Sequence, residues 1–256
     1  MKSDLELLSK LKEKDLARQG LMVLEGRLVI EKALESGIVP RFIVCTEAER
    51  LHWEARLSSV ALYVMPHDEL CQLVDFKFHR GALAVADMPD LQGFEAAGAG
   101  VGQRLYLCLW GVTDPSNLGA LIRTAAGLGA DGILLGPGCA NPFYRKALRA
   151  SMGTVFRLPV WKVDRDVIAA CAKSGSLIIG AALSERAIPI GRLEETLPAA
   201  LNDSLILVLG NEGYGLPYEV LSLCSLEVCI PMVRGVDSLN VAVAGGILMY
   251  ELFGER

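Results

Sequence analysis

Residues 204–217 read SLILVLGNEGYGLP, an unbroken apolar run that ends in a turn with three glycines among six residues. A long helical pattern over 238–253 closes the chain. Unbroken apolar strands separated by helices predict an α/β fold with a parallel sheet covered on both faces. Similar apolar runs recur after residue 103, with helical patterns between them: LYLCLW at 105–110, GILLG at 132–136, LPVWKV at 158–163, SLIIGAAL at 176–183 and VCIPM at 228–232.

The residues before this region predict a smaller α/β domain. It begins with an amphipathic helix, because its leucines recur at helical spacing. Residues 87–103 are rich in Gly and Ala and lack periodicity, which is typical of a linker. The sequence therefore predicts a domain over 1–86, a linker over 87–103 and a second domain over 104–256. Within the first domain we expect the leading helix around Leu5, Leu7, Leu8 and Leu11, strands at 21–24, 42–45, 61–65 and 82–86, and helices over 27–36, 47–58 and 68–74.

Composition favours a cytoplasmic globular protein. Of 256 residues, 52% are hydrophobic and 21% are charged, which provides for a sizeable core. The mean hydropathy of +0.38 is high, but the longest apolar stretch, 241–249, is far shorter than the ~20 residues of a spanning helix. The N-terminus is charged and lacks the apolar core of a signal peptide. The net charge of −5 requires any RNA-binding face to be local.

Cysteine and histidine usage predicts neither a metal site nor a disulfide framework. The seven cysteines are irregularly spaced, none forms a CxxC pair, and the chain has three histidines. Most of the cysteines lie in apolar runs, where a thiol behaves as a small buried hydrophobe.

Three junctions are candidate ligand sites, because ligands of parallel sheets bind where strand carboxyl ends lead into helices. They are residues 110–123, 209–216 and 230–240. The literal GxGxxG at 127–132 ends a helix and precedes a strand, so it is read as a helix end and turn rather than as a dinucleotide-binding loop.

In the first junction, Asn117 is expected to cap a helix over about 119–128. Arg123 follows on an otherwise apolar helix, where its side chain either extends to solvent or binds an anionic partner. In the second junction, the glycines around Glu212 favour close approach of backbone to a ligand.

In the third junction, Asp237 or Ser238 is expected to cap the last helix, with Asn240 in its first turn. That helix is small and apolar on the face of Val241, Ala244, Gly245 and Leu248. Such a face packs closely on the sheet or on another subunit.

These three junctions together resemble the ordered motifs of the TrmH/SpoU family, within the SPOUT class of RNA methyltransferases. The motifs are Asn117-x-Gly119-x-x-x-Arg123, Leu209-Gly210-Asn211-Glu212-Gly213, and Ile230-Pro231-Met232 followed by Ser238-Leu239-Asn240-Val241. Residues 25–27 and 79–82 resemble the ribosomal-protein-like substrate-binding domain often found before such catalytic domains. Arg234 departs from the pattern, since many members have Gly there, and this bears on the shape of the cofactor loop.

The resemblance implies a trefoil knot in the C-terminal domain, a homodimer, S-adenosylmethionine as cofactor, and methylation of a ribose 2′-hydroxyl in structured RNA, with ribosomal RNA preferred over transfer RNA. It implies catalytic roles for Asn117, Arg123, Glu212, Ser238 and Asn240, and a cofactor pocket at Leu209, Gly210, Ile230, Met232 and Leu239. A loop-locking hydrogen bond is the alternative role for Ser238. Whether Arg123 acts as a base or as an electrostatic anchor stays open, although a guanidinium is always protonated in proteins, which favours the anchor.

Residues 142–163 contain five basic residues and no acidic one. We expect Arg145, Lys146 and Arg149 to bind RNA together with the basic residues at 77–80; a solvated helix face is the alternative. Two further functions stay open, a non-catalytic RNA-binding module and a methyltransferase acting on an RNA base. The Asn117 and Arg123 pair favours ribose methylation.

Overall fold

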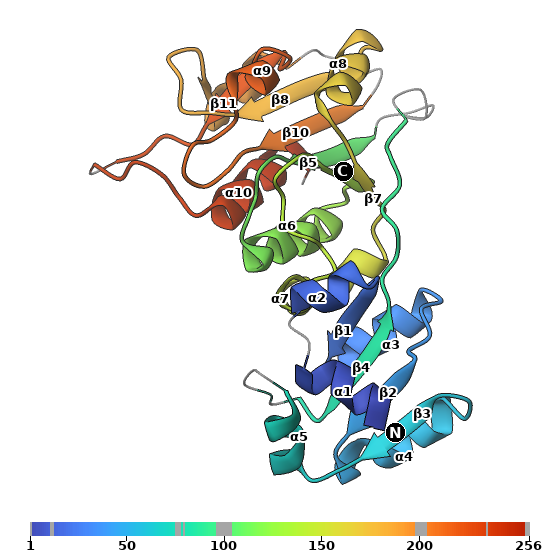
Figure 1. Cartoon of the computed structure of the whole chain (residues 1–256). Helices are drawn as coiled ribbons and strands as arrows, with labels where there is room; N and C mark the ends of the chain where they lie inside the picture. The colour runs from blue at the N-terminus through green and yellow to red at the C-terminus, as the bar shows by residue number, and fades with distance from the viewer. Residues whose placement is uncertain are drawn as a thin grey trace. The chain divides into compact units, whose positions relative to one another are not determined.

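The computed structural model describes residues 2–10, 13–74, 78, 80–95, 104–197, 204–233 and 235–253. The chain forms two compact units (Figure 1). Unit 1 comprises Met1–Asp90 and Asn141–Arg157, and unit 2 comprises Leu91–Ala140 and Leu158–Arg256. The division therefore differs from the expected one, because a segment from the middle of the expected second domain folds with unit 1.

Unit 1 is built on a four-stranded sheet in the order β1-β4-β2-β3. Strand β4 is antiparallel to both of its neighbours, and β2 and β3 are parallel. The elements lie within two residues of those expected, apart from the leading helix, which forms two short helices. Their bounds are α1 Lys2–Lys10, α2 Glu13–Arg18, β1 Leu21–Glu25, α3 Arg27–Glu35, β2 Phe42–Cys45, α4 Glu47–Arg56, β3 Ala61–Val64, α5 His67–Leu73, β4 Ala82–Asp87, α7 Arg145–Ala150 and the 3₁₀ helix η2 Thr154–Phe156.

A buried carboxylate connects α7 to β1 within unit 1. The side chain of Glu25 is 1% exposed, and it pairs with Arg145 at 2.7 Å and with Arg149 at 3.2 Å. The backbone N–H of Arg145 also donates to the carboxylate of Glu13 in α2. Because a carboxylate is buried only when it is paired and hydrogen-bonded, these contacts explain why residues 141–157 fold with unit 1.

Unit 2 is built on a seven-stranded sheet in the order β7-β6-β5-β10-β8-β11-β9, and every pair in it is parallel. The expected parallel α/β fold is thereby confirmed. The short strand β9 has no counterpart among the expected elements. The bounds are β5 Leu105–Leu109, α6 Pro115–Gly127, β6 Gly132–Leu135, β7 Val160–Lys162, α8 Arg165–Lys173, β8 Leu177–Ala181, β9 Ile188–Pro189, η3 Ile190–Glu195, β10 Leu205–Leu209, α9 Tyr218–Leu221, β11 Leu226–Cys229 and α10 Val241–Phe253.

Helices cover both faces of this sheet, with α6 and α10 on one side and α8 and α9 on the other (Figure 1). Alternate residues of the central strands β5 and β10 face the α8 and α9 side, where Cys108 and Val208, with Ile178 of β8, pack against Ile168 and Val220. Every residue of β5 and β10 is buried. None of the helices in the described ranges is long and apolar enough to cross a membrane.

Candidate active site

The three junctions singled out in the sequence meet at one edge of the unit 2 sheet. Strand β10 pairs with β5 in parallel, and Leu209 lies opposite Leu109 at the carboxyl ends of the two strands. The loops that follow them therefore start side by side. Helix α10 packs on α6 and β10, which brings the third junction to the same edge.

The start of α6 is set by Asp114 and Pro115. The Asp114 carboxylate accepts hydrogen bonds of 2.9 Å from the backbone N–H groups of Ser116 and Asn117, and Pro115 occupies the first helical position. The expectation that Asn117 caps this helix is wrong, because Asp114 precedes the proline and already caps it. The side chain of Asn117 is therefore directed to other contacts.

Asn117 connects the other two junctions through hydrogen bonds. Its side-chain nitrogen donates to Glu212 Oε1 at 2.9 Å, and its side-chain oxygen accepts from Asn240 Nδ2 at 3.0 Å. The resulting chain, Glu212–Asn117–Asn240, joins the first turn of α6 to the loops after β10 and β11. Three residues 95 and 123 positions apart in the sequence thus form one polar cluster.

Asn240 has a second function as the cap of α10. Its side-chain oxygen accepts from the backbone N–H groups of Ala242 at 2.9 Å and Val243 at 3.4 Å. The expected cap, Asp237 or Ser238, is wrong, since α10 begins only at Val241. Capping fixes the orientation of the Asn240 amide and leaves its nitrogen to donate to Asn117. Asn117 must then direct its own nitrogen at the Glu212 carboxylate.

The turn that carries Glu212 is held by Asn211. The side chain of Asn211 donates to the carbonyl of Gly111 at 2.8 Å and accepts from the backbone of Gly213 at 2.7 Å and of Tyr214 at 3.3 Å. Its backbone pairs with Gly215 in both directions. A Cβ at Gly210 would lie 2.3 Å from the carbonyl carbon of Gly215, so only glycine fits there.

A half-buried thiol lies beside this cluster. Cys139 donates to the carbonyl of Leu109 at 3.1 Å. Burial raises the pKa of the Cys139 thiol, and the nearby Glu212 carboxylate raises it further, against backbone hydrogen bonds that lower it. The sulfur therefore stays protonated and adds no charge to the site at neutral pH.

Arg123 and Ser238 do not take part in this network. Both side chains are exposed. Within the described part of the chain, neither has a hydrogen bond or an ion pair with Asn117, Glu212 or Asn240. The structure thus brings together three of the five expected catalytic residues and leaves the other two on the surface of unit 2.

The expected cofactor residues surround the same edge. Leu209 and Gly210 are buried at the end of β10, whereas Ile230, Met232 and Leu239 are half-buried in the loop between β11 and α10. This loop has no regular secondary structure in its described residues. Arg234, the departure from the family pattern, lies outside them.

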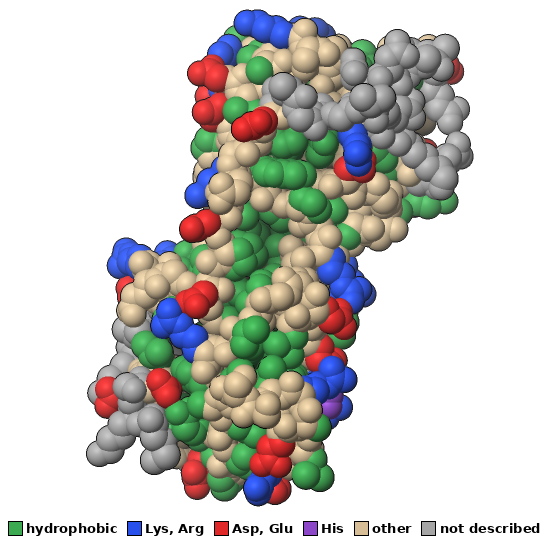
Figure 2. All heavy atoms as spheres, turned by 90° about the vertical axis from the view of Figure 1, so that its right-hand side faces the viewer, with side chains coloured by type: hydrophobic (Ala, Val, Ile, Leu, Met, Phe, Trp, Pro, Cys, Tyr) green, Lys and Arg blue, Asp and Glu red, His purple; other side chains and the backbone are tan. Residues whose placement is uncertain are grey.

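The expected RNA-binding residues lie in unit 1. Lys146 is exposed on α7, but Arg145 and Arg149 pair with the buried Glu25, which gives them a structural role that the sequence pattern did not indicate. Lys77 and His79 lie outside the described residues. On the face drawn in Figure 2, the described Lys and Arg side chains are interspersed with Asp and Glu.

The sequence analysis did not predict that Asp114 and Asn211 hold their loops in place, or that the half-buried Cys139 lies near Glu212. The dipeptide Asp-Pro directly after a strand is a helix-start signal that could have identified Asp114. For Asn211, an asparagine opening a glycine-rich turn is a recognisable signal, because its side chain bonds to the backbone two residues on. The proximity of Cys139 to Glu212 has no sequence signal, since it depends on the order of strands in the sheet.

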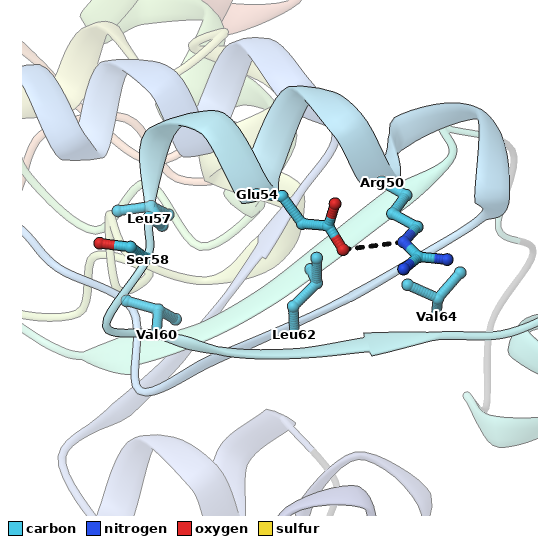
Figure 3. Close-up of a pocket in the computed structure, with 7 residues that line it drawn as sticks. All are labelled: Arg50, Glu54, Leu57, Ser58, Val60, Leu62 and Val64. Carbon is cyan, nitrogen blue, oxygen red and sulfur yellow. Dashed lines mark hydrogen bonds and ion pairs between the residues drawn. The ribbon is translucent and has the colours of Figure 1, made fainter.

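A surface groove of about 430 Å³ lies in unit 1, between α4 and β3 (Figure 3). Arg50 and Glu54 form an ion pair of 2.8 Å on its helix side. None of the expected site residues lines it, so the groove is separate from the cluster around Asn117. Its other lining residues are Leu57, Ser58, Val60, Leu62 and Val64.

Comparison with known proteins finds similar sequences and structures among RNA methyltransferases. The SpoU rRNA Methylase family matches residues 104–250. An uncharacterized tRNA/rRNA methyltransferase of Mycobacterium tuberculosis is 32% identical over 241 residues, 91% of this chain and 81% of the relative. The 23S rRNA (guanosine(2553)-2′-O)-methyltransferase of Bacillus subtilis is 29% identical, over 94% of this chain and 92% of the relative. The AdoMet-bound rRNA methyltransferase from Sinorhizobium meliloti has a TM-score of 0.80 at 24% identity, over 97% of this chain and 92% of that one.

Proposed function

The chain belongs to the SpoU rRNA Methylase family, and on this premise we propose that it transfers a methyl group from S-adenosylmethionine to a ribose 2′-hydroxyl of structured RNA, ribosomal RNA being preferred over transfer RNA. The observation that carries the proposal is the Glu212–Asn117–Asn240 cluster, which unites the three motifs at one sheet edge. The 2′-O activity of the Bacillus subtilis relative supports ribose as the acceptor.

The residues at this edge fit the cofactor. When bound, S-adenosylmethionine would supply a methyl group on a sulfonium sulfur, and transfer of this group to the acceptor oxygen would leave the sulfur as a neutral thioether. Leu209 and Gly210 lie at the end of β10 on this edge, and the half-buried apolar side chains of Ile230, Met232 and Leu239 offer contact surface for the adenine and the methionine stem. Together, these residues would hold the cofactor.

Asn117, Ser238 and Glu212 would orient the 2′-hydroxyl, and Arg123 would bind a phosphate and stabilise the developing alkoxide. A guanidinium is always charged in proteins and has no acceptor site, so Arg123 acts as an anchor rather than as a base. The hydroxyl proton then leaves to a phosphate oxygen or to water. Such an arrangement accelerates the reaction by positioning and electrostatic stabilisation.

Two further expectations belong to this proposal. Unit 2 would carry the trefoil knot that the resemblance implies, and unit 1 would bind the RNA. Because Arg145 and Arg149 are engaged by Glu25, the exposed Lys146 is the member of the expected set that can reach phosphate without losing an ion pair. A Lys146→Ala variant would flatten the salt dependence of RNA binding without affecting cofactor binding.

The homodimer is proposed on the exposed face of α10. Val243, Ile247 and Tyr250 lie on one side of this helix at 53%, 37% and 64% exposure, while the opposite side is buried against α6 and β10. A helix that is apolar on both sides is typical of one that packs on its own core and on a partner.

Mapping of 2′-O-methyl sites in cells with and without the gene tests the reaction. One or more sites should disappear in the deletion and return with the wild-type gene. A gene that encodes Asn117→Asp should fail to restore them, because the new carboxylate would lie 2.9 Å from that of Glu212. A gene that encodes Ser116→Ala should restore them. If every ribose site persists and a base methylation disappears instead, the base-methyltransferase alternative replaces the proposal.

Calorimetry with S-adenosylmethionine separates an enzyme from a non-catalytic RNA-binding module. The purified protein should bind the cofactor, and absence of binding together with retained RNA affinity would favour the module.

An Arg123→Lys enzyme tests the anchor. A lysine keeps the charge but loses the bidentate fork, so methyl transfer should fall well below that of the wild type at every pH. Near-full activity with only a shifted pH profile would contradict anchoring by Arg123.

A further inference from the structure

Tyr214 is the most exposed large hydrophobic residue of the described chain, and it lies in the turn of the candidate active site. Its side chain is 90% exposed, two residues after Glu212 and one before Gly215. Nothing in the core of unit 2 accounts for a tyrosine there, because so exposed a ring stabilises no packing.

The backbone under this ring is held rigidly. Asn211 accepts from the N–H groups of Gly213 and Tyr214, pairs twice with Gly215, and donates to the carbonyl of Gly111 on the neighbouring loop. The close approach of Gly210 to Gly215 locks the turn from below. An aromatic side chain on such a turn loses only the freedom of two side-chain torsions when it binds, so it is well suited to recognition.

Proteins that act on unpaired nucleotides stack aromatic side chains on the faces of the exposed bases. Consecutive Cα atoms are about 3.8 Å apart, so Tyr214 lies within about 7.6 Å of Glu212, measured between Cα atoms. A base attached to a ribose at the Glu212–Asn117–Asn240 cluster, or the base next to it, is within reach of the ring.

We propose that Tyr214 is the stacking platform for an unpaired base at or next to the methylated nucleotide. The proposal rests on the proposed function and adds a substrate-binding residue to it: the RNA would present its target in a loop, bulge or unstacked segment. The phenol oxygen has no required part, since stacking uses the face of the ring.

Another exposed tyrosine serves as the comparison. Tyr218, four residues further on at the first position of α9, is 79% exposed. It has equal chemistry and similar exposure, but it lies outside the turn that Asn211 holds. A general effect of removing an exposed tyrosine would appear equally at both positions. Tyr250 is less suitable, because it lies on the face of α10 proposed for the dimer.

The experiment measures transfer of tritiated methyl groups from S-adenosylmethionine to bulk RNA from a strain that lacks the gene. The enzymes are the wild type and the full-length variants Tyr214→Ala, Tyr214→Phe, Tyr214→Trp and Tyr218→Ala. Removing the ring at 214 should lower kcat/KM for RNA by roughly 5- to 150-fold, mainly through KM, as expected for the loss of one stacked base. Phenylalanine and tryptophan at 214, and alanine at 218, should stay close to wild type.

Cofactor affinity by calorimetry and the thermal midpoint should be unchanged in all four variants. Equal kcat/KM for Tyr214→Ala and wild type would overturn the proposal, as would a Tyr214→Phe enzyme as impaired as Tyr214→Ala. Weakened cofactor binding or a lowered midpoint in Tyr214→Ala would overturn it in favour of a structural role. No methyl transfer by the wild type to any RNA would instead overturn the proposed function, and Tyr214 stacking with it.

Discussion

The orientation of one amide organises the candidate site. Asn240 must direct its oxygen at the N-terminus of α10, which commits its nitrogen to Asn117 and, in turn, the nitrogen of Asn117 to Glu212. A helix cap thereby determines the donors and acceptors of the whole cluster. Changing any of the three side chains affects the orientation of the other two.

The thiols of Cys45 and Cys224 make the stability of the protein depend on pH. Burial raises the pKa of Cys45 from an ordinary 9.0 to about 11 and that of Cys224 to about 12. A raised pKa in the folded state stabilises the protein below pH 9, and this stabilisation is lost as the pH rises through 9 toward 11. The urea midpoint should therefore fall between pH 8.5 and about 10.5.

Alkylation by iodoacetamide provides an independent measure. At pH 8 the folded protein should react at these cysteines much more slowly than the urea-unfolded protein, as counted by peptide mass spectrometry. Equal rates in the two states would contradict burial of the thiols.

Among the elements, the contact of α10 with α6 and β10 depends on a single glycine. A Cβ at Gly245 would lie 2.4 Å from Leu121 Cδ2 and 2.6 Å from Leu209 Cδ1. Gly245→Ala should lower the free energy of unfolding by about 1–3 kcal/mol, because the core must shift to admit the methyl group. Urea denaturation measures the change.

The neighbouring Gly246 is the matched control, since the nearest side-chain atom, Thr124 Cγ2, is 3.9 Å from an added Cβ. Gly246→Ala should be neutral or gain roughly 0.5–1 kcal/mol from reduced backbone entropy. If both substitutions had the same effect, helix propensity rather than packing would govern this helix.

The buried carboxylate of Glu25 holds α7 in unit 1. Glu25→Gln removes the buried charge that Arg145 and Arg149 share, and breaking such a pair costs about 3–5 kcal/mol. The measurement is the free energy of unfolding from urea titration.

Glu35→Gln provides the comparison, because Glu35 and its partner Arg157 are each 56% exposed. Loss of that ion pair should cost less than ~1 kcal/mol. An equally small loss in Glu25→Gln would mean that hydrophobic contacts alone hold α7 in place.

We expect the whole molecule to assemble as a homodimer through α10. The chain has a mass of 27.5 kDa, and light scattering at micromolar concentration should give twice that value if α10 pairs with a second copy. Val243→Glu should yield the monomer, because it places a charge in the apolar contact.

Val39→Glu is the control, since Val39 is similarly exposed at 60% but lies in unit 1. It should leave the mass at the dimer value. A monomeric wild type would rule out the proposed contact, and a dimeric Val243→Glu protein would move it to another face.

Local pattern determined the elements of both units. Apolar runs of four to eight residues with helices between them predicted nearly every strand, because burial on both faces requires such runs. The three junctions that contain Asn117, Glu212 and Asn240 followed from the same order, since carboxyl ends of parallel strands meet at one edge.

Only the tertiary structure decided which side chains cap and which are left to the site. Asp114 rather than Asn117 begins α6, and Asn240 rather than Ser238 begins α10, because competition among neighbouring polar residues for the same N–H groups is settled by the loop's path. The strand order put Cys139 beside Glu212. The basic residues of α7 are paired with a carboxylate 120 positions away, and a charge pattern read along the chain contains no information about so distant a partner.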